Sequence, residues 1–349
     1  IRHCNFASAI KHQKEVQGIL PTSRVYDFAS YAFDVAWANA LLTFESGACL
    51  CIPSDADRKD NLNGSIAQLK PTHADLTPSA ALVLSKESLQ QLDTLTLGGE
   101  RLLAEYATKW SQFVTVKNSY GPSECTPTAT FTDGIGRGHD LGASIGKPAG
   151  LNTWVVDPMT GQSLVPIGSV GELFLEGPLV GAGYLGDAKK TNAAFIHDPS
   201  FLLRGNVVGQ PGRRGTLYKT GDIVRYNSDG SLTFVCRKDT QIKINGQRVE
   251  LAEIESHMAR YTATRQVATL LPSTGLCASK LVAMISFTDV HYDVNEDLAE
   301  NKIELASSKH DQLINEHIET LQSFLRGSLP QYMIPSLWVV LYNLPMTAS

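Results

Sequence analysis

Short strands and helices alternate through the first third of the chain, and this alternation limits the fold more than any other feature. Residues 24–52 predict a helix that opens at 31–33 and ends at Gly47, followed by a short buried strand at 48–52. The pattern then repeats, with a helix from about Thr77, a strand at 94–97, a helix at 100–110 and a strand at 113–116. Strand–helix–strand units this short are typical of a mostly parallel α/β sheet.

The character of the sequence changes twice after this region. From 142 to 238, glycines separate short β-rich runs, which predicts an antiparallel sheet or a small barrel. The polar, acidic stretch 288–309 is expected to be a solvated insertion. Around it, a compact α+β unit is predicted, with helices at 250–260 and 310–326 and strands at 267–271, 281–287 and 336–341. We therefore expect a large α/β and β-rich region over 1–238 and a small C-terminal unit over 239–349.

Composition excludes several classes of protein. A chain of 349 residues with 43% hydrophobic and 19% charged residues fits a globular protein of two or three domains. The net charge of −5 argues against a dedicated nucleic-acid binder, and no apolar run approaches the roughly 20 residues of a membrane span. The six cysteines are scattered without a zinc-type spacing. We therefore expect reduced thiols and a cytoplasmic location.

Two turn-rich segments combine residues that suit a nucleotide. Residues 118–124 (NSYGPSE) follow a predicted strand, at the carboxyl edge where open α/β sheets bind ligands. There Tyr120 offers a flat face to a purine and Glu124 an oxygen ligand to a hard cation, although a plain turn with a surface carboxylate is the alternative. In residues 218–222 (YKTGD), Asp222 suits a grip on ribose hydroxyls, or belongs to an ordinary hairpin turn.

Two further segments carry charge. Residues 237–250 (RKDTQIKINGQRVE) form a basic, hairpin-like stretch with Gly246 in its turn, which could bind phosphate or ribose or be a solvated ribbon. Asp34 enters an apolar helix, where a buried carboxylate needs a partner. That partner is either a ligand ammonium or a backbone cap.

In order and spacing, these segments resemble the core motifs of adenylation domains from nonribosomal peptide synthetases, in the adenylate-forming superfamily. Residues 118–124 resemble NxYGPTE, residues 171–184 (GELFLEGPLVGAGY) resemble GELxIxGxxVxxGY, and residues 218–222 match Y(K/R)TGD. Residues 237–255 (RKDTQIKINGQRVELAEIE) resemble RxDxQVKIRGxRIELGEIE, and residues 329–335 (LPQYMIP) match LPxYMIP. Residues 20–85 are most similar in style to fungal synthetases.

The resemblance implies that an amino acid and ATP give aminoacyl-AMP and pyrophosphate. The acyl group then passes to the phosphopantetheine thiol of a peptidyl carrier domain, with a condensation domain in the same polypeptide. By position, the nucleotide contacts fall on Gly98, Gly99, Glu100, Tyr120, Gly121, Asp222 and Arg237. Asp222 and Arg237 are implied to act at the ribose and Glu124 at Mg²⁺, and these three form the implied catalytic set. Asp239 is implied as the hinge of the small domain and Gly246 as part of the thiolation tunnel.

Two motifs of the family are expected outside the two ends of the chain. A Gly/Ser/Thr-rich phosphate loop with its lysine would precede Ile1, and a final catalytic lysine would come two residues after Ser349. The chain as given is therefore expected to be a fragment that adenylates poorly or not at all by itself, whereas its parent protein can be fully active.

The resemblance also locates an acyl pocket. Asp34 falls where members that activate α-amino acids keep an aspartate for the substrate ammonium. Counted from the family's motifs, the resemblance implies the other lining positions: Val35, Ala38, Asp75, Thr96, Gly98, Ser119, Pro127 and Thr128. Several of these are small, so we expect a roomy pocket. Asp75 favours a substrate with a distal donor or cation, unless it points away or caps the helix near Thr77.

The pocket set resembles those for ornithine-like residues. Our hypothesis is ornithine or an N5-acyl-N5-hydroxyornithine, as in a hydroxamate siderophore synthetase. Two other functions stay open: an acyl- or aryl-CoA ligase of the same superfamily, and a non-catalytic adenylation-like scaffold. Asp34 counts against the ligase, and the retained nucleotide residues count against the scaffold.

Overall fold

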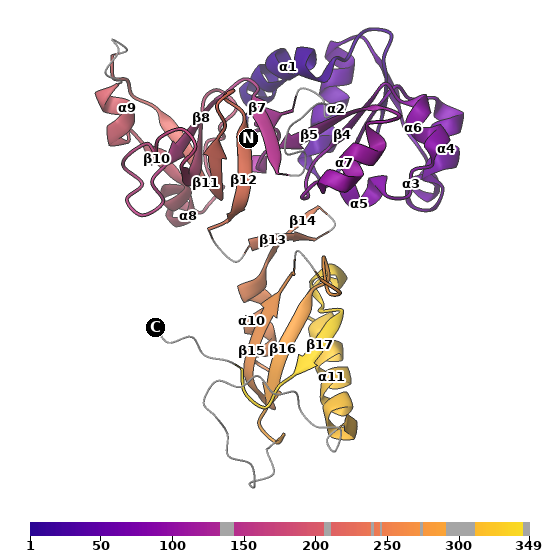
Figure 1. Cartoon of the computed structure of the whole chain (residues 1–349), viewed down its shortest axis with the longest axis vertical. Helices are drawn as coiled ribbons and strands as arrows, with labels where there is room; N and C mark the ends of the chain where they lie inside the picture. Colours follow the sequence, from indigo (N-terminus) through magenta and orange to yellow (C-terminus); the bar gives the residue numbers. More distant parts are fainter. Residues whose placement is uncertain are drawn as a thin grey trace. The chain divides into compact units, whose positions relative to one another are not determined.

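The computed structural model describes residues 1–132, 143–205, 211–238, 241–244, 246–272, 275–290 and 311–344. The chain divides into two compact units, Ile1–Asp239 and Thr240–Ser349, which are described separately below (Figure 1). The sequence places the boundary one residue earlier, between 238 and 239. Residue 239 itself, the expected hinge, lies outside the described residues.

A parallel sheet forms the first part of the larger unit, as the alternation of strands and helices predicts. Its strand order is β2-β1-β3-β4-β5, with bounds Cys49–Cys51, Arg24–Tyr26, His73–Leu76, Thr94–Leu97 and Thr115–Tyr120. The last strand begins later than the predicted 113–116 and continues further. The reason is a pairing that the local pattern does not reveal, since Ser119 and Tyr120 pair with Phe131 and Thr130 of β6.

Seven helices are interleaved with these strands in the described part of this region: α1 (His3–Gln17), α2 (Asp34–Glu45), α3 (Asp55–Asp60), α4 (Leu62–Leu69), α5 (Pro78–Ala81), α6 (Lys86–Gln91) and α7 (Ala104–Trp110). The prediction that α2 opens at 31–33 is wrong, because Phe33 is still extended and acts as its N-cap residue. The helix predicted from 100 begins only at Ala104, and the helix predicted from Thr77 is a single turn. Strand β2 is an edge strand with Cys49 exposed rather than a buried strand.

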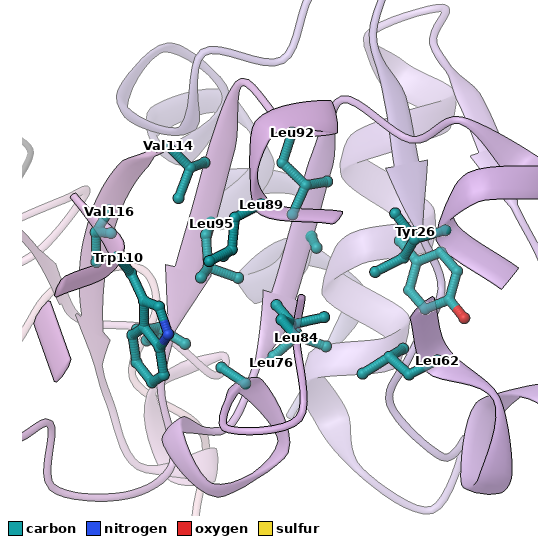
Figure 2. Close-up of a cluster of buried hydrophobic side chains, with 14 of the residues drawn as sticks. Tyr26, Leu62, Leu76, Leu84, Leu89, Leu92, Leu95, Trp110, Val114 and Val116 are labelled. Atoms are coloured by element: carbon teal, nitrogen blue, oxygen red, sulfur yellow. The ribbon is translucent and has the colours of Figure 1, made fainter. Parts of the chain in front are cut away.

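The two faces of the parallel sheet differ in chemistry. On one face, α4, α6 and α7 pack on the strands through a cluster that includes Tyr26, Leu62, Leu76, Leu89, Leu95, Trp110 and Val116 (Figure 2). Because side chains alternate along a strand, the opposite face of β3, β4 and β5 carries mostly polar residues: His73, Asp75, Thr94, Thr96, Lys117 and Ser119. Helix α1 lies over this polar face, where the Lys117 ammonium donates to the Val16 carbonyl.

The glycine-punctuated region is antiparallel, one of the two arrangements that its sequence predicts, and it continues the parallel sheet, which the sequence does not predict. The path runs β5-β6-β7-β12-β11-β9-β8, with β10 paired to β11. The added strands are β6 (Thr130–Phe131), β7 (Ser144–Pro148), β8 (Asn152–Val156), β9 (Val170–Glu176), β10 (Phe195–His197), β11 (Thr216–Tyr226) and β12 (Leu232–Arg237). Two helices, α8 (Ala188–Ala194) and α9 (Ser200–Arg204), precede and follow β10.

The smaller unit has the α+β composition that the sequence predicts. A hairpin of β13 (Gln241–Ile244) and β14 (Gln247–Glu250) precedes α10 (Leu251–Met258). A three-stranded sheet of β15 (Thr264–Leu270), β16 (Val282–Phe287) and β17 (Leu337–Val340) packs with α11 (Asp311–Arg326). Most of the predicted insertion 288–309 lies outside the described residues. Across the described ranges, none of the helices combines the length and apolar character of a membrane span.

Candidate active site

The predicted pocket residues of the parallel sheet gather at its carboxyl edge. Asp75 and Thr96 each lie one residue before the end of their strands and are direct neighbours in the register of β3 and β4. Gly98 follows β4 and is adjacent to Ser119 of β5, whose hydroxyl donates to the Leu97 carbonyl at 3.2 Å. A Cβ atom at Gly98 would collide with the Ser119 side chain. Four of the predicted positions therefore lie side by side on the polar face.

Helix α2 presents the predicted ammonium ligand. Asp34 is its first residue, where the N-terminal end of a helix stabilises a carboxylate. Its Oδ2 atom is buried and makes no hydrogen bond to any residue within the described ranges. The backbone cap offered as the alternative partner therefore does not satisfy this oxygen. On the same helix, Val35 is half-buried and Ala38 is buried.

Asp75 has an unusual environment for a carboxyl group. Burial raises its pKa to about 7, and the nearby Asn39 side chain of α2 works against this rise. The alternative that Asp75 caps the following helix is wrong, because the Thr77 hydroxyl accepts the capping hydrogen bond from the Ala80 amide at 3.2 Å. Asp75 also keeps some accessible surface.

The predicted adenine and ribose residues form one hydrogen-bonded group. The Tyr120 hydroxyl at the end of β5 donates to Asp222 Oδ2 in β11, a contact between residues 102 positions apart. Arg237 of β12 lies opposite Asp222 in the register and donates to its Oδ1 at 2.8 Å and to the Thr220 carbonyl at 2.7 Å. Burial and the Asp222 charge hold the pKa of Tyr120 well above its usual range. Tyr120 is thus a neutral donor that helps to fix the Asp222 carboxylate.

Glu124 lies in the short 3₁₀ turn Ser123–Cys125 that follows β5. Its Oε1 accepts a 2.6 Å hydrogen bond from the Tyr184 hydroxyl, and its backbone carbonyl accepts from the Gly181 amide at 2.8 Å. No cluster of three or more His, Cys, Asp or Glu side chains suitable for a metal occurs among the described residues. One carboxylate nevertheless suits Mg²⁺, which proteins commonly hold through one or two carboxylates together with substrate phosphates.

Close backbone packing surrounds the Tyr120 loop. A Cβ atom at Gly121 would collide with the backbone at 127–129, so only glycine fits there. Pro127 is buried, and the Thr128 carbonyl accepts a 2.7 Å hydrogen bond from Gln13 of α1. Gly99 has a φ of 81°, in the left-handed region that favours glycine. Oε2 of Glu100 accepts hydrogen bonds from the Ser79 amide and hydroxyl at 2.9 and 2.6 Å, whereas its buried Oε1 accepts none from the described residues.

One predicted residue belongs to the smaller unit. Gly246 lies in the β13–β14 turn of the smaller unit with a φ of 75°. Two residues of the site were not identified as such from sequence, Tyr184 and Asn39. Tyr184 ends the quoted segment 171–184, and Asn39 is an amide within an apolar helix. A cavity of about 510 Å³ that includes Arg2, Asn5 and His197 in its lining contains none of the predicted site residues.

Comparisons with known proteins indicate the family of the chain. Over its full length the chain is 43% identical to a nonribosomal peptide synthetase, ungA, of Aspergillus violaceofuscus, but it spans 4% of that protein. It is 52% identical to a peramine synthetase, ppzA, of Metarhizium majus over an aligned stretch of 260 residues. This stretch covers 74% of the chain and 9% of the relative. The chain therefore corresponds to a small part of these relatives.

A solved structure shares the fold. The adenylation domain AlmE of Vibrio cholerae, in complex with glycyl-adenosine-5'-phosphate, superposes with a TM-score of 0.76 at 25% identity, over 99% of this chain and 60% of that one. The sequence model of the AMP-binding enzyme family matches residues 1–185, more than half of the chain. With the polar sheet edge and the Tyr120–Asp222–Arg237 group in place, the chain belongs to the family of AMP-binding enzymes.

Proposed function

We propose that the chain is part of an adenylation domain of a nonribosomal peptide synthetase and that this domain joins an amino acid to ATP. The observation that carries the proposal is the hydrogen-bonded group of Tyr120, Asp222 and Arg237. Tyr120 is the last residue of β5 and directly follows Ser119, which lies with Asp75 and Thr96 at the carboxyl edge of the parallel sheet. The similarity to synthetases of filamentous fungi supports it, as does the aminoacyl adenylate bound by AlmE.

The reaction needs positioning and charge neutralisation rather than a general base. The substrate carboxylate is itself the nucleophile: it attacks the α-phosphorus of ATP, and pyrophosphate leaves. In the proposed arrangement, Asp34 binds the substrate ammonium and Asp222 accepts from the ribose hydroxyls. Arg237 and Tyr120 hold the Asp222 carboxylate in place, and the Tyr120 ring stacks on adenine. Glu124 would hold Mg²⁺, which neutralises phosphate charge when bound.

The second half of the proposed function is transfer of the acyl group to the phosphopantetheine thiol of a peptidyl carrier domain. The thiolate attacks the acyl carbonyl and AMP leaves. We assign the hinge for this step to Asp239 and a place in the pantetheine tunnel to Gly246, and we expect a condensation domain in the same polypeptide. A protein that contains adenylation and PCP domains, PA1221, has a similar fold, with a TM-score of 0.73 and 23% identity over 97% of this chain and 54% of that one.

The proposed substrate is an ornithine-like amino acid. Asp34 and Asp75 provide two carboxyl groups. In the proposal, Asp34 binds the α-ammonium of the substrate and Asp75 binds a donor or cation at the end of its side chain. Gly98 and Ala38 are small residues at two of the expected lining positions, and the proposal assigns them the space through which a side chain reaches the second carboxyl group. Ornithine and N5-acyl-N5-hydroxyornithine both meet this description, and the second would place the protein in hydroxamate siderophore synthesis.

The test is ATP–pyrophosphate exchange with a panel of amino acids, using the domain expressed with its flanking gene sequence. We expect exchange that depends on ornithine or its N5-substituted derivative. Preference for a bulky aromatic or small apolar amino acid would overturn the substrate assignment. Activation of acids without an amino group, trapped with hydroxylamine, would indicate a CoA ligase. Absence of ATP binding in calorimetry, with and without Mg²⁺, would indicate a scaffold.

A further inference from the structure

A buried carboxylate opens the loop that leads to the expected ammonium ligand. Asp27 directly follows β1 and is 1% exposed, and its amide donates to the Cys51 carbonyl of β2 at 2.9 Å. Its Oδ2 accepts a 2.6 Å hydrogen bond from the Tyr31 hydroxyl, whereas Oδ1 is buried and accepts none from the described residues. Burial of a carboxylate is costly unless hydrogen bonds compensate it. The Tyr31 hydroxyl is therefore important to this group.

The start of α2 lacks the usual side-chain cap. Phe33 is the N-cap residue, and its side chain accepts no hydrogen bond from the first turn of the helix. Asp34, the expected ammonium ligand, is the first residue of this helix. A helix end without a capping side chain must take its position from other contacts.

Tyr31 and Trp37 supply such contacts on either side of Asp34. The Tyr31 carbonyl accepts a 3.2 Å hydrogen bond from the indole N–H of Trp37, the fourth residue of α2. The two rings also pack, with centroids 6.3 Å apart. The pairing resembles a hydrophobic staple, in which a residue before the N-cap packs on the fourth helical residue. Through its hydroxyl, Tyr31 ties this staple to Asp27 and so to the end of β1.

The neighbouring charges leave Tyr31 as the partner of Asp27. Arg58 of α3 lies with its guanidinium carbon 6.0 Å from the centroid of the Tyr31 ring. Within the described ranges, Arg58 pairs with Asp55 at 3.5 Å rather than with Asp27. The hydrogen bond to Asp27 raises the pKa of Tyr31, so the hydroxyl remains a protonated donor at neutral pH.

We propose that Asp27 and Tyr31 are positioning residues for the amino-acid substrate: their hydrogen bond fixes the loop 27–33 and thereby holds Asp34 where it binds the α-ammonium. The inference rests on the proposed function and deepens it, because it assigns the residues that set the ammonium ligand in place. A carboxylate on an ordered loop binds a cation without the entropic cost of ordering that loop. Loosening the loop should weaken recognition of the α-amino group and spare the nucleotide residues on β5, β11 and β12.

The experiment measures pyrophosphate exchange by Tyr31→Phe in the domain expressed with its flanking gene sequence. L-ornithine is the substrate, and 5-aminopentanoate, which lacks only the α-amino group, is the competitive inhibitor. We expect the ornithine KM to rise about tenfold, a partial loss of the contact between Asp34 and the ammonium. The Ki of 5-aminopentanoate and the KM of ATP should stay within twofold. If wild type prefers another amino acid, that amino acid and its analogue without the α-amino group take their places.

Further variants make the result specific. Asp27→Asn keeps an acceptor for the Tyr31 hydroxyl and should retain most of the affinity for ornithine, whereas Asp27→Ala should match Tyr31→Phe. In an Asp34→Asn background, Tyr31→Phe should change the ornithine KM by less than twofold, because both changes act on the same contact. Tyr106→Phe is the matched control, since Tyr106 stacks on Trp110 of α7 through its ring, with centroids 5.5 Å apart. It should alter none of these constants.

Folding of the variants is checked by thermal unfolding. The Tyr31 side chain is half exposed, so removal of its hydroxyl opens no cavity in the core. If Tyr31→Phe nevertheless unfolds, Trp37→Phe tests the same loop, because it removes the indole donor to the Tyr31 carbonyl and keeps an aromatic ring. We expect Trp37→Phe to raise the ornithine KM severalfold and to leave the Ki of 5-aminopentanoate within twofold.

The outcomes separate this inference from the proposed function. An ornithine KM for folded Tyr31→Phe within twofold of wild type overturns the positioning role and leaves the proposed function intact. Equal weakening of ornithine and 5-aminopentanoate would show that the loop only supports the pocket as a whole, and it likewise overturns the inference. An undiminished effect of Tyr31→Phe in the Asp34→Asn background would show that Tyr31 does not act through Asp34. Absence of any amino-acid-dependent exchange in wild type refutes the proposed function itself.

Discussion

Asp222→Asn is expected to weaken ATP binding far more than it weakens the fold. The Asp222 carboxylate is 6% exposed and serves Tyr120 through one oxygen and Arg237, at 2.8 Å, through the other. Asparagine keeps an acceptor for Arg237 and offers its NH₂ to the Tyr120 oxygen, so the local hydrogen bonds survive around a neutral residue 222. What is lost is the charge.

The loss of this negative charge sets the expected decrease in affinity for ATP. Hydrogen bonds to a charged group contribute about 1.5–3 kcal/mol, so the Kd for ATP should rise about 10- to 150-fold if Asp222 accepts from the ribose. The cost in stability should be smaller, about 1–2 kcal/mol, because Arg237 retains its bond to the Thr220 carbonyl at 2.7 Å. In a unit of this size that is a fall in Tm of roughly 2–8 °C.

Isothermal titration with ATP and Mg²⁺ gives the Kd, and thermal unfolding without nucleotide gives the Tm. The control is Asp60→Asn, at the exposed end of α3, which should change the free energy of unfolding by less than about 0.5 kcal/mol and leave the Kd unchanged. A Kd for Asp222→Asn within threefold of wild type, with the protein folded, would refute the assignment of Asp222 to the ribose.

Three further predictions test neighbouring residues. Tyr120→Phe should change the Kd for ATP by less than about threefold, since the ring remains, whereas Tyr120→Ala should lose about 1–3 kcal/mol of stacking; equal effects in titration calorimetry would contradict adenine stacking. Gly121→Ala should destabilise the fold by about 1–3 kcal/mol in denaturant unfolding, because its Cβ would meet the backbone at 127–129; an unchanged midpoint would show that the loop can move aside. Asp75 has a folded-state pKa of about 7 against 3.8, so its ionisation opposes folding: the penalty is absent below pH 3.8 and complete above pH 7. The free energy of unfolding of unliganded Asp75→Asn, relative to wild type, should therefore rise by up to about 4 kcal/mol between pH 4 and pH 8. A difference in unfolding free energy that stays constant across that range would argue against a buried carboxyl group.

Much of the fold could be predicted because it depends on local patterns. The alternation of apolar strands with helices predicts the parallel sheet, and the strand at Thr94–Leu97 lies at its predicted position. In the smaller unit, α11 spans Asp311–Arg326 against a predicted 310–326. The errors fall where an element's limits depend on distant partners. Strand β5 continues to Tyr120 because β6 pairs with it, and that pairing is invisible in the local sequence.

The sequence by itself determined which residue types follow the strands in their turns. These turns contain the motifs that resemble adenylating enzymes, and the motifs can be found in the sequence because each is a contiguous stretch of chain. Only the tertiary structure decided which of these residues meet. The Tyr120–Asp222 and Glu124–Tyr184 contacts join positions 102 and 60 residues apart. The physical reason is that such contacts are set by strand register and helix packing, which depend on the whole sheet rather than on any short segment.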